Sequence, residues 1–149
     1  MPTIYVDADA CPVKAEAVKV GLRHGMEVIF VANQGMSLPR GRGVRLEVVP
    51  GDFDAADDWI AERAGPRDVV VTADIPLAAR CLDKGARVIG PAGRPFTPDN
   101  IGDALASREI AADLRAYGLG GGPPPFSPRD RSRFLQALEL AARAVSKPG

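Results

Sequence analysis

Apolar residues follow two patterns along this chain. Some form short continuous runs, and in most of the segments between these runs they recur at the spacing of an amphipathic helix. Short runs rich in β-branched residues are typical of strands that are buried on both faces. Five runs predict such strands: the run from Thr3 that ends at Asp7, Glu27 to Ala32, Val44 to Val49, the run from Val69 that ends at Asp74, and Ala86 to Ile89. The pattern therefore predicts a five-stranded sheet.

The segments with helical spacing begin at prolines or capping residues, and most of them end at glycines. They are Val13 to His24 after a first helical residue at Pro12, a segment capped by Asp54 that ends before Gly65, a segment that begins at Pro76 and ends at Gly85, Ile101 to Tyr117, and a last helix capped by Ser127. Phe134, Leu138 and Val145 form an apolar stripe on the last helix. This stripe is expected to pack on the sheet of this chain or on a second subunit, which would make a homodimer.

Two segments fit neither pattern. Asn33 to Gly43 is predicted to be a loop, so the second crossover lacks a helix, and residues 118–128 form a Gly/Pro-rich connector to the last helix. Strands that alternate with helices predict an α/β fold with a mostly parallel sheet flanked by helices. A chain of 149 residues has the size of one domain, so we expect residues 1–149 to fold as a single unit.

Composition narrows the class of protein only a little. Hydrophobic residues make up 46%, charged residues 26%, and acidic and basic side chains balance at 19 each, which argues against a nucleic-acid coat protein or a membrane-surface binder. Without a leader or a membrane-length apolar run, we expect a cytoplasmic protein with no membrane segment. Cys11 and Cys81 are expected to be reduced, packed thiols, and His24 a surface or helix-capping residue.

Carboxylates mark the ends of two predicted strands. Asp7 and Asp9 follow the first strand, and Asp74 follows the fourth, in each case just before a proline that starts a helix. Because the carboxyl ends of parallel strands lie at one edge, where α/β proteins bind ligands, Asp74 is expected to approach Asp7 if the strands are neighbours. Asp9 is the less certain member, since it is also placed to cap the helix after Pro12.

A third group of acids starts the helix after the third strand. Asp54 is expected to cap this helix and Asp57 to lie in its first turn, where the macrodipole favours negative charge. Asp58 exceeds what a helix start needs. We therefore expect Asp57 or Asp58, or both, to face the same edge as Asp7, although solvation of this acidic face remains an alternative.

Together, Asp7, Asp9, Asp57, Asp58 and Asp74 predict an oxygen-only metal site. Such ligands select Mg²⁺ or Mn²⁺ over zinc, and ions of this kind orient phosphates, generate a nucleophile and neutralise the leaving oxygen. Three further side chains are candidates for binding flanking phosphates: Arg40, Arg42 and Arg94. The alternative for these arginines is that they are solvated loop residues.

Several motifs resemble the YaiI/YqxD family of uncharacterised bacterial proteins. They are I-Y-V-D-A-D-A-C-P-V-K, G-D-F-D-A-A-D-D-W-I, V-V-T-A-D-I-P-L-A, the segment from Thr97 to Ile101, and G-G-P-P-P-F-S-P-R-D-R-S-R-F. The resemblance extends to the PIN-like nucleases, which implies a three-layer, Rossmann-like fold and metal-dependent cleavage of RNA, with Asp7 and Asp74 as catalytic acids. Asp74 matches the acid of a T-x-D motif. The fourth acid of the PIN pattern is missing between Gly90 and Arg94, and Asp99 is its only near substitute.

Two other functions remain open from the sequence. The D-x-D motif of Asp7 and Asp9 also resembles haloacid-dehalogenase-type phosphatases, in which the first Asp is phosphorylated. Those enzymes need a Ser or Thr at the end of the next strand and a later lysine, and Ala32-Asn33 and Thr72 fit these requirements poorly. The second alternative is a non-catalytic protein whose acidic pocket binds a metal or a basic partner.

Overall fold

A mixed β-sheet forms the centre of the protein. The computed structural model describes residues 2–9, 11–52, 54–107 and 126–146. The described strands are β1 (Thr3–Asp7), β2 (Glu27–Ala32), β3 (Val44–Val48), β4 (Val69–Val71), β5 (Arg87–Ile89) and β6 (Pro95–Phe96). They form one sheet in the order β3-β2-β1-β4-β5-β6, and only β6 runs antiparallel to its neighbour. The predicted α/β fold is confirmed, with one strand more than the five that were predicted.

The additional strand directly follows Arg94, in a segment for which no strand was predicted. β6 has only two residues, and they pair with Val88 and Ile89 of β5. A strand this short has no hydrophobic periodicity, and proline at its first residue argues against a strand in sequence. Its pairing is a product of the tertiary fold.

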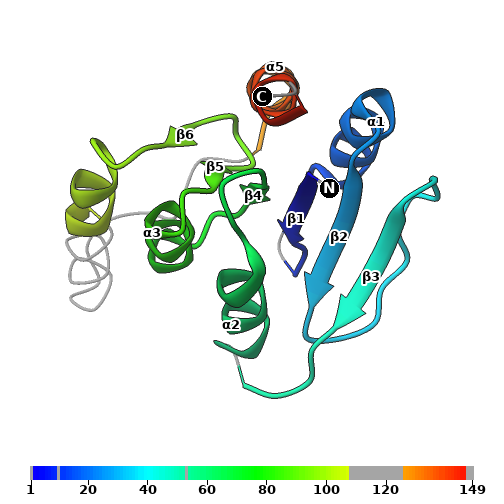
Figure 1. Cartoon of the computed structure of the whole chain (residues 1–149), viewed down its shortest axis with the longest axis horizontal. Helices are drawn as coiled ribbons and strands as arrows, with labels where there is room; N and C mark the ends of the chain where they lie inside the picture. Colours follow the sequence, from blue (N-terminus) through cyan, green and yellow to red (C-terminus); the bar gives the residue numbers. More distant parts are fainter. Residues whose placement is uncertain (1, 10, 53, 108–125, 147–149) are drawn as a thin grey trace.

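Helices cover both faces of the sheet, which gives three layers (Figure 1). The helices with described bounds are α1 (Lys14–His24), α2 (Asp54–Arg63), α3 (Ile75–Asp83) and α5 (Pro128–Ser146). Ile4, Val6 and Phe30 pack with α1 and α5, whereas the alternate residues Tyr5 and Val31 pack with α2 and α3. The two-residue period of β1 therefore directs Asp7, which follows Val6, towards the layer of α2 and α3.

The packing of α5 is shown by the burial of its apolar stripe. Phe134, Leu138 and Ala142 are fully buried in the same cluster as β1 and α1. The guanidinium of Arg131 forms an ion pair with Glu16 of α1. α5 therefore docks on the sheet of its own chain, which was one of the two alternatives.

Several helix boundaries differ from those predicted. α1 begins at Lys14, so Pro12 precedes the helix. Asp54 is the first residue of α2, and the side chain of Asp52 accepts the Asp54 backbone N–H at 3.1 Å, so Asp54 is not the capping acceptor that was predicted. The helix predicted over 101–117 is described only for 101–107, and its remainder and residues 118–125 of the connector lie outside the described residues.

Other predicted features agree with the structure. The α1 helix ends at His24, and Gly25 caps it in a left-handed conformation with φ of 65°. Ser127 and Asp130 cap the start of α5 reciprocally, at 3.0 and 3.2 Å. Cys11 and Cys81 are both buried and free. Within the described ranges no helix has the length and hydropathy needed to cross a membrane.

Candidate functional site

Asp7 ends β1, and Thr72 directly follows the neighbouring strand β4, at the carboxyl edge of the sheet. β1 pairs with β4 so that Val6 lies opposite Val71, which brings the next residue of each strand together. The Thr72 hydroxyl donates a hydrogen bond to Asp7 Oδ2 at 2.9 Å, and Thr72 is 1% exposed. The orientation of the Asp7 carboxylate is therefore fixed by a buried hydroxyl.

Asp74 joins the same network through its backbone. Its N–H donates to Thr72 Oγ1 at 3.0 Å, and its side-chain Oδ1 accepts the N–H of Leu77 at 2.9 Å as the N-cap of α3. Thr72 thus links the two strand-end aspartates, which are half-buried. The prediction that Asp74 approaches Asp7 is confirmed, because β1 and β4 are direct neighbours.

Asp57 brings a third carboxylate to this edge from α2. The pKa of Asp57 is raised from 3.8 to about 7, mainly by burial and also by the negative charges of Asp74, Asp7 and Asp54, while Arg80 opposes these effects. Burial is also the main cause that raises the pKa of Asp7, and the charges of Asp74 and Asp9 add to it. The site therefore carries more negative charge than its surroundings neutralise.

Asp58 and Asp9 are engaged elsewhere. The Asp58 carboxylate forms an ion pair with Arg80 at 2.7 Å, and both side chains are about half exposed. Asp9 is exposed and accepts the backbone N–H of Asn33 at 3.2 and 3.4 Å. It does not cap α1, whose N-cap is Val13 without a side-chain hydrogen bond. Of the predicted acids, Asp7, Asp57 and Asp74 are thus the set that interacts most directly.

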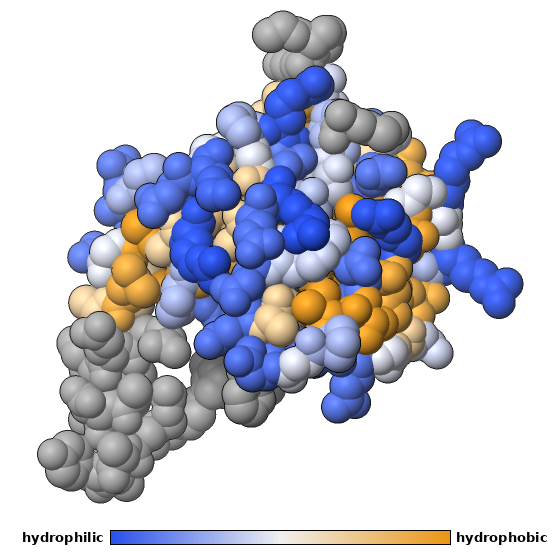
Figure 2. Space-filling model, turned by 60° about the horizontal axis from the view of Figure 1, so that its bottom comes forward, coloured by the Kyte–Doolittle hydropathy of each residue, from blue (hydrophilic) through white to orange (hydrophobic). Residues whose placement is uncertain are grey.

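The site is polar on the surface as well as in its buried part. The carboxyl ends of the strands point towards the bottom of Figure 1, and Figure 2 turns this side of the molecule forward. Hydrophilic side chains cover the centre of the face in Figure 2, and hydrophobic side chains gather beside them. A charged ligand would therefore meet a polar surface at this edge.

The predicted metal site can be compared with the donors present. Among the described residues, no three His, Cys, Asp or Glu side chains are arranged closely enough to form a ready metal-binding group. Mg²⁺, however, is commonly bound by one or two carboxylates while substrate phosphates and water complete its shell. Asp7 and Asp74 fit that mode, and the side-chain oxygen of Asn33 is buried with no hydrogen-bond partner in the part of the chain that the structure describes.

The three predicted arginines do not gather around these acids. Gly43 O accepts the N–H of Val28 and Val44 pairs with Val28, which places Arg40 and Arg42 towards the amino edge, opposite the carboxylates. Arg94 does follow β5 at the carboxyl edge, but β4 separates β5 from β1. Its guanidinium lies 5.7 Å from the centroid of the Phe96 ring. Separation from Asp7 leaves Arg40 and Arg42 outside this site.

Sequence reasoning missed three residues near the acids. Thr72 was read only as part of T-x-D, although a hydroxyl two residues before a helix-capping Asp is placed to join both acids. Arg80 of α3 forms an ion pair with Asp58 of the acidic helix α2, and the only signal for it was that two amphipathic helices were expected to pack on one face of the sheet. Asn33 gave no signal, since it follows a buried strand like any loop residue.

Comparison with known proteins gives one consistent result. Residues 5–144 match the model of an uncharacterised bacterial family described as YaiI/YqxD. UPF0178 proteins of Agrobacterium fabrum and Parvibaculum lavamentivorans are 57% and 58% identical to this chain, over 98% and 99% of it and 96% and 97% of their own lengths. The UPF0178 protein of Rhodospirillum centenum is 56% identical over 99% of both chains. No solved structure matches the chain.

Proposed function

The chain belongs to the YaiI/YqxD family, and from its acidic edge we propose that it is a Mg²⁺- or Mn²⁺-dependent phosphodiesterase that cleaves RNA. The observation that carries the proposal is the convergence of Asp7, Asp57 and Asp74: the charge of Asp74 helps to raise the pKa of both Asp7 and Asp57, and the charge of Asp7 helps to raise that of Asp57. A divalent cation bound there would offset this repulsion. The choice of RNA rests on the resemblance to PIN-like nucleases.

In this proposal, Asp7 and Asp74 hold the ion, and their geometry is fixed by the rest of the fold. The Thr72 hydroxyl orients Asp7, and the first turn of α3 orients Asp74. When bound, the ion would polarise the scissile phosphate and stabilise charge on the leaving oxygen. Asp57, with a pKa of about 7, carries a proton in part of the molecules at neutral pH and releases it when positive charge enters the site.

Asp9 and Asp58 have secondary roles in this scheme. Each already has a partner, the Asn33 N–H for Asp9 and the Arg80 guanidinium for Asp58. The Asp58–Arg80 pair is exposed, so Arg80 is available to a phosphate that approaches from solvent. We therefore assign Arg80 to the binding of an RNA phosphate beside the carboxylates.

The test is cleavage of an end-labelled, mixed-sequence RNA in Mg²⁺ or Mn²⁺. Asp7→Asn and Asp74→Asn keep the size of the side chain, and asparagine still caps a helix, so the fold is preserved. Each variant should lose about 100-fold or more in rate, which corresponds to about 2.7 kcal/mol in the transition state. The matched control is Asp83→Asn, which changes an exposed aspartate on α3 and should leave the rate unchanged.

Other outcomes would contradict the proposal and point to a different function. Turnover of phosphomonoesters without RNA cleavage would indicate a phosphatase of the haloacid-dehalogenase kind. Calorimetric binding of Mn²⁺ that depends on Asp7 and Asp74, with no turnover of RNA, DNA or phosphomonoesters, would indicate a non-catalytic metal-binding protein. No binding of either ion at millimolar concentration would remove all metal-dependent schemes.

A further inference from the structure

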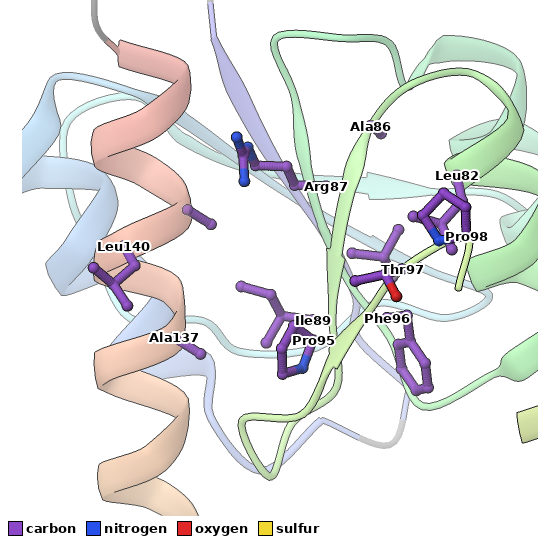
Figure 3. A pocket seen from close by; sticks show the side chains of 12 residues that line it. Leu82, Ala86, Arg87, Ile89, Pro95, Phe96, Thr97, Pro98, Ala137 and Leu140 are labelled. Carbon is purple, nitrogen blue, oxygen red and sulfur yellow. The ribbon is translucent and has the colours of Figure 1, made fainter. Parts of the chain in front are cut away.

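An apolar groove lies beside β5, away from Asp7, Asp57 and Asp74. It has a volume of about 380 Å³, within the range of small-molecule sites, and opens to solvent between β5, β6 and α5 (Figure 3). Its main apolar walls are Leu82, Ile89, Phe96, Pro98, Ala137 and Leu140.

The groove exists because β6 is short and α5 presents small side chains. β6 pairs only with Val88 and Ile89 of β5, so β6 does not extend beside Arg87. On the opposite wall, Ala137 and Ala141 of α5 fill little of the space. Leu140 is 65% exposed, the most exposed large hydrophobic side chain in the described part of the chain. Apolar surface is thus left open on both walls.

One cation stands at the end of this groove. Arg87 is the only charged residue among the described residues that line it, and it is exposed. Figure 3 shows its side chain extending from β5 towards α5. Within the described ranges no carboxylate forms an ion pair with Arg87, so its guanidinium is available to an anionic ligand.

We propose that this groove binds a small amphipathic carboxylate. The apolar body of the ligand would lie between Ile89 and Leu140, and its carboxylate would pair with the guanidinium of Arg87. Arginine is suited to this role because its planar fork of N–H groups matches a carboxylate. The inference uses none of the acidic residues and stands independently of the proposed phosphodiesterase.

The charge and the volume together select this class of ligand. An uncharged apolar ligand would gain nothing from Arg87, and a multiply charged one would leave charges against Leu140 and Phe96 without partners. An apolar ligand chain would remove the exposed surface of Leu140 from water, which favours binding. A ligand with a single carboxylate at one end of an apolar chain would contact both apolar walls and pair with Arg87.

The test uses decanoate as the probe and the full chain as the protein, with binding followed by calorimetry below the concentration at which decanoate forms micelles. Decanol, which has the same chain without the charge, is the ligand control. Arg87→Gln should weaken decanoate binding about tenfold or more and leave decanol binding unchanged, because a hydrogen bond to a charged group is lost. Leu140→Gln should weaken binding of both ligands. All these positions are exposed, so the variants fold.

Matched controls lie outside the groove. Arg40→Gln removes another exposed arginine and Leu22→Gln another exposed leucine, at 47% exposure, and neither should change decanoate binding. The proposal is overturned if decanoate fails to saturate, if it binds no more tightly than decanol, or if Arg87→Gln has no effect. It is also overturned if sedimentation shows a dimer that Leu140→Gln dissociates and decanoate does not, since a second copy would then occupy the groove.

Discussion

Asparagine at position 57 should stabilise the protein at alkaline pH and lose that advantage in acid. In the wild type, burial and the neighbouring carboxylates favour the protonated form of Asp57 and raise its pKa to about 7. The unfolded chain has the ordinary value near 3.8. Between these values the folded state binds more protons than the unfolded state, so the free energy of unfolding falls as pH rises from about 4 to about 7. Asparagine carries no charge and does not show this loss.

The magnitude follows from the two proton affinities. Their difference corresponds to about 4 kcal/mol between the protonation states. Because Asp57 is only partly buried, solvent screening reduces the effect on stability to about 1–2 kcal/mol. The stability of Asp57→Asn relative to wild type should therefore rise by about 1–2 kcal/mol between pH 4.5 and pH 8.

The assay is urea unfolding at both pH values in the presence of a chelator, followed by the fluorescence of the single tryptophan, Trp59, in α2. Asp83→Asn serves as the control. A stability difference that stays flat or falls with increasing pH in Asp57→Asn would refute the electrostatic reasoning. An equal rise in Asp83→Asn would do so as well, because the effect would then not depend on the cluster.

Three further substitutions test other parts of the structure by thermal or urea unfolding. Thr72→Val should destabilise by about 1–3 kcal/mol, since it removes a buried hydroxyl that makes two hydrogen bonds. Arg131→Gln should cost about 1–2 kcal/mol by leaving Glu16 without its cation, and an unchanged midpoint would contradict this. Gly93→Ala should cost about 3 kcal/mol, because φ is 91° and a Cβ would lie 2.5 Å from backbone, whereas Gly102→Ala in open space should not destabilise.

Much of the sheet could be predicted from the sequence because its central strands are buried on both faces. Val69–Val71 and the run from Val28 to Ala32 are apolar without interruption, and that pattern has few alternatives in a chain of this size. β6 could not be predicted, since its two residues pair only because the chain turns back beside β5. Helix starts shifted by a residue or two for a similar reason: proline and aspartate mark a region, and the backbone selects the capping residue within it.

Only part of the candidate site could be predicted from the sequence as well. Asp7 and Asp74 could be predicted because strand ends lie at one edge once the strands are neighbours. The partners of Asp9 and Asp58 could not, since they depend on where Asn33 and Arg80 lie in space. Loop arginines carry no information about which edge they reach, and Arg42 lies at the edge away from the acids because its loop runs from the carboxyl end of β2 back to the amino end of β3.

The place of α5 in the chain bears on biosynthesis. Its Phe134 and Leu138 complete a core whose other members include Ile4, Val6 and Val20, which leave the ribosome first. Until α5 emerges, a nascent chain presents the part of that apolar face that α5 covers to solvent. A message truncated before the codon for Phe134 would thus yield a chain that already contains every acidic residue of the site but lacks the helix that closes its core. Such a product would be a substrate for chaperones and proteases.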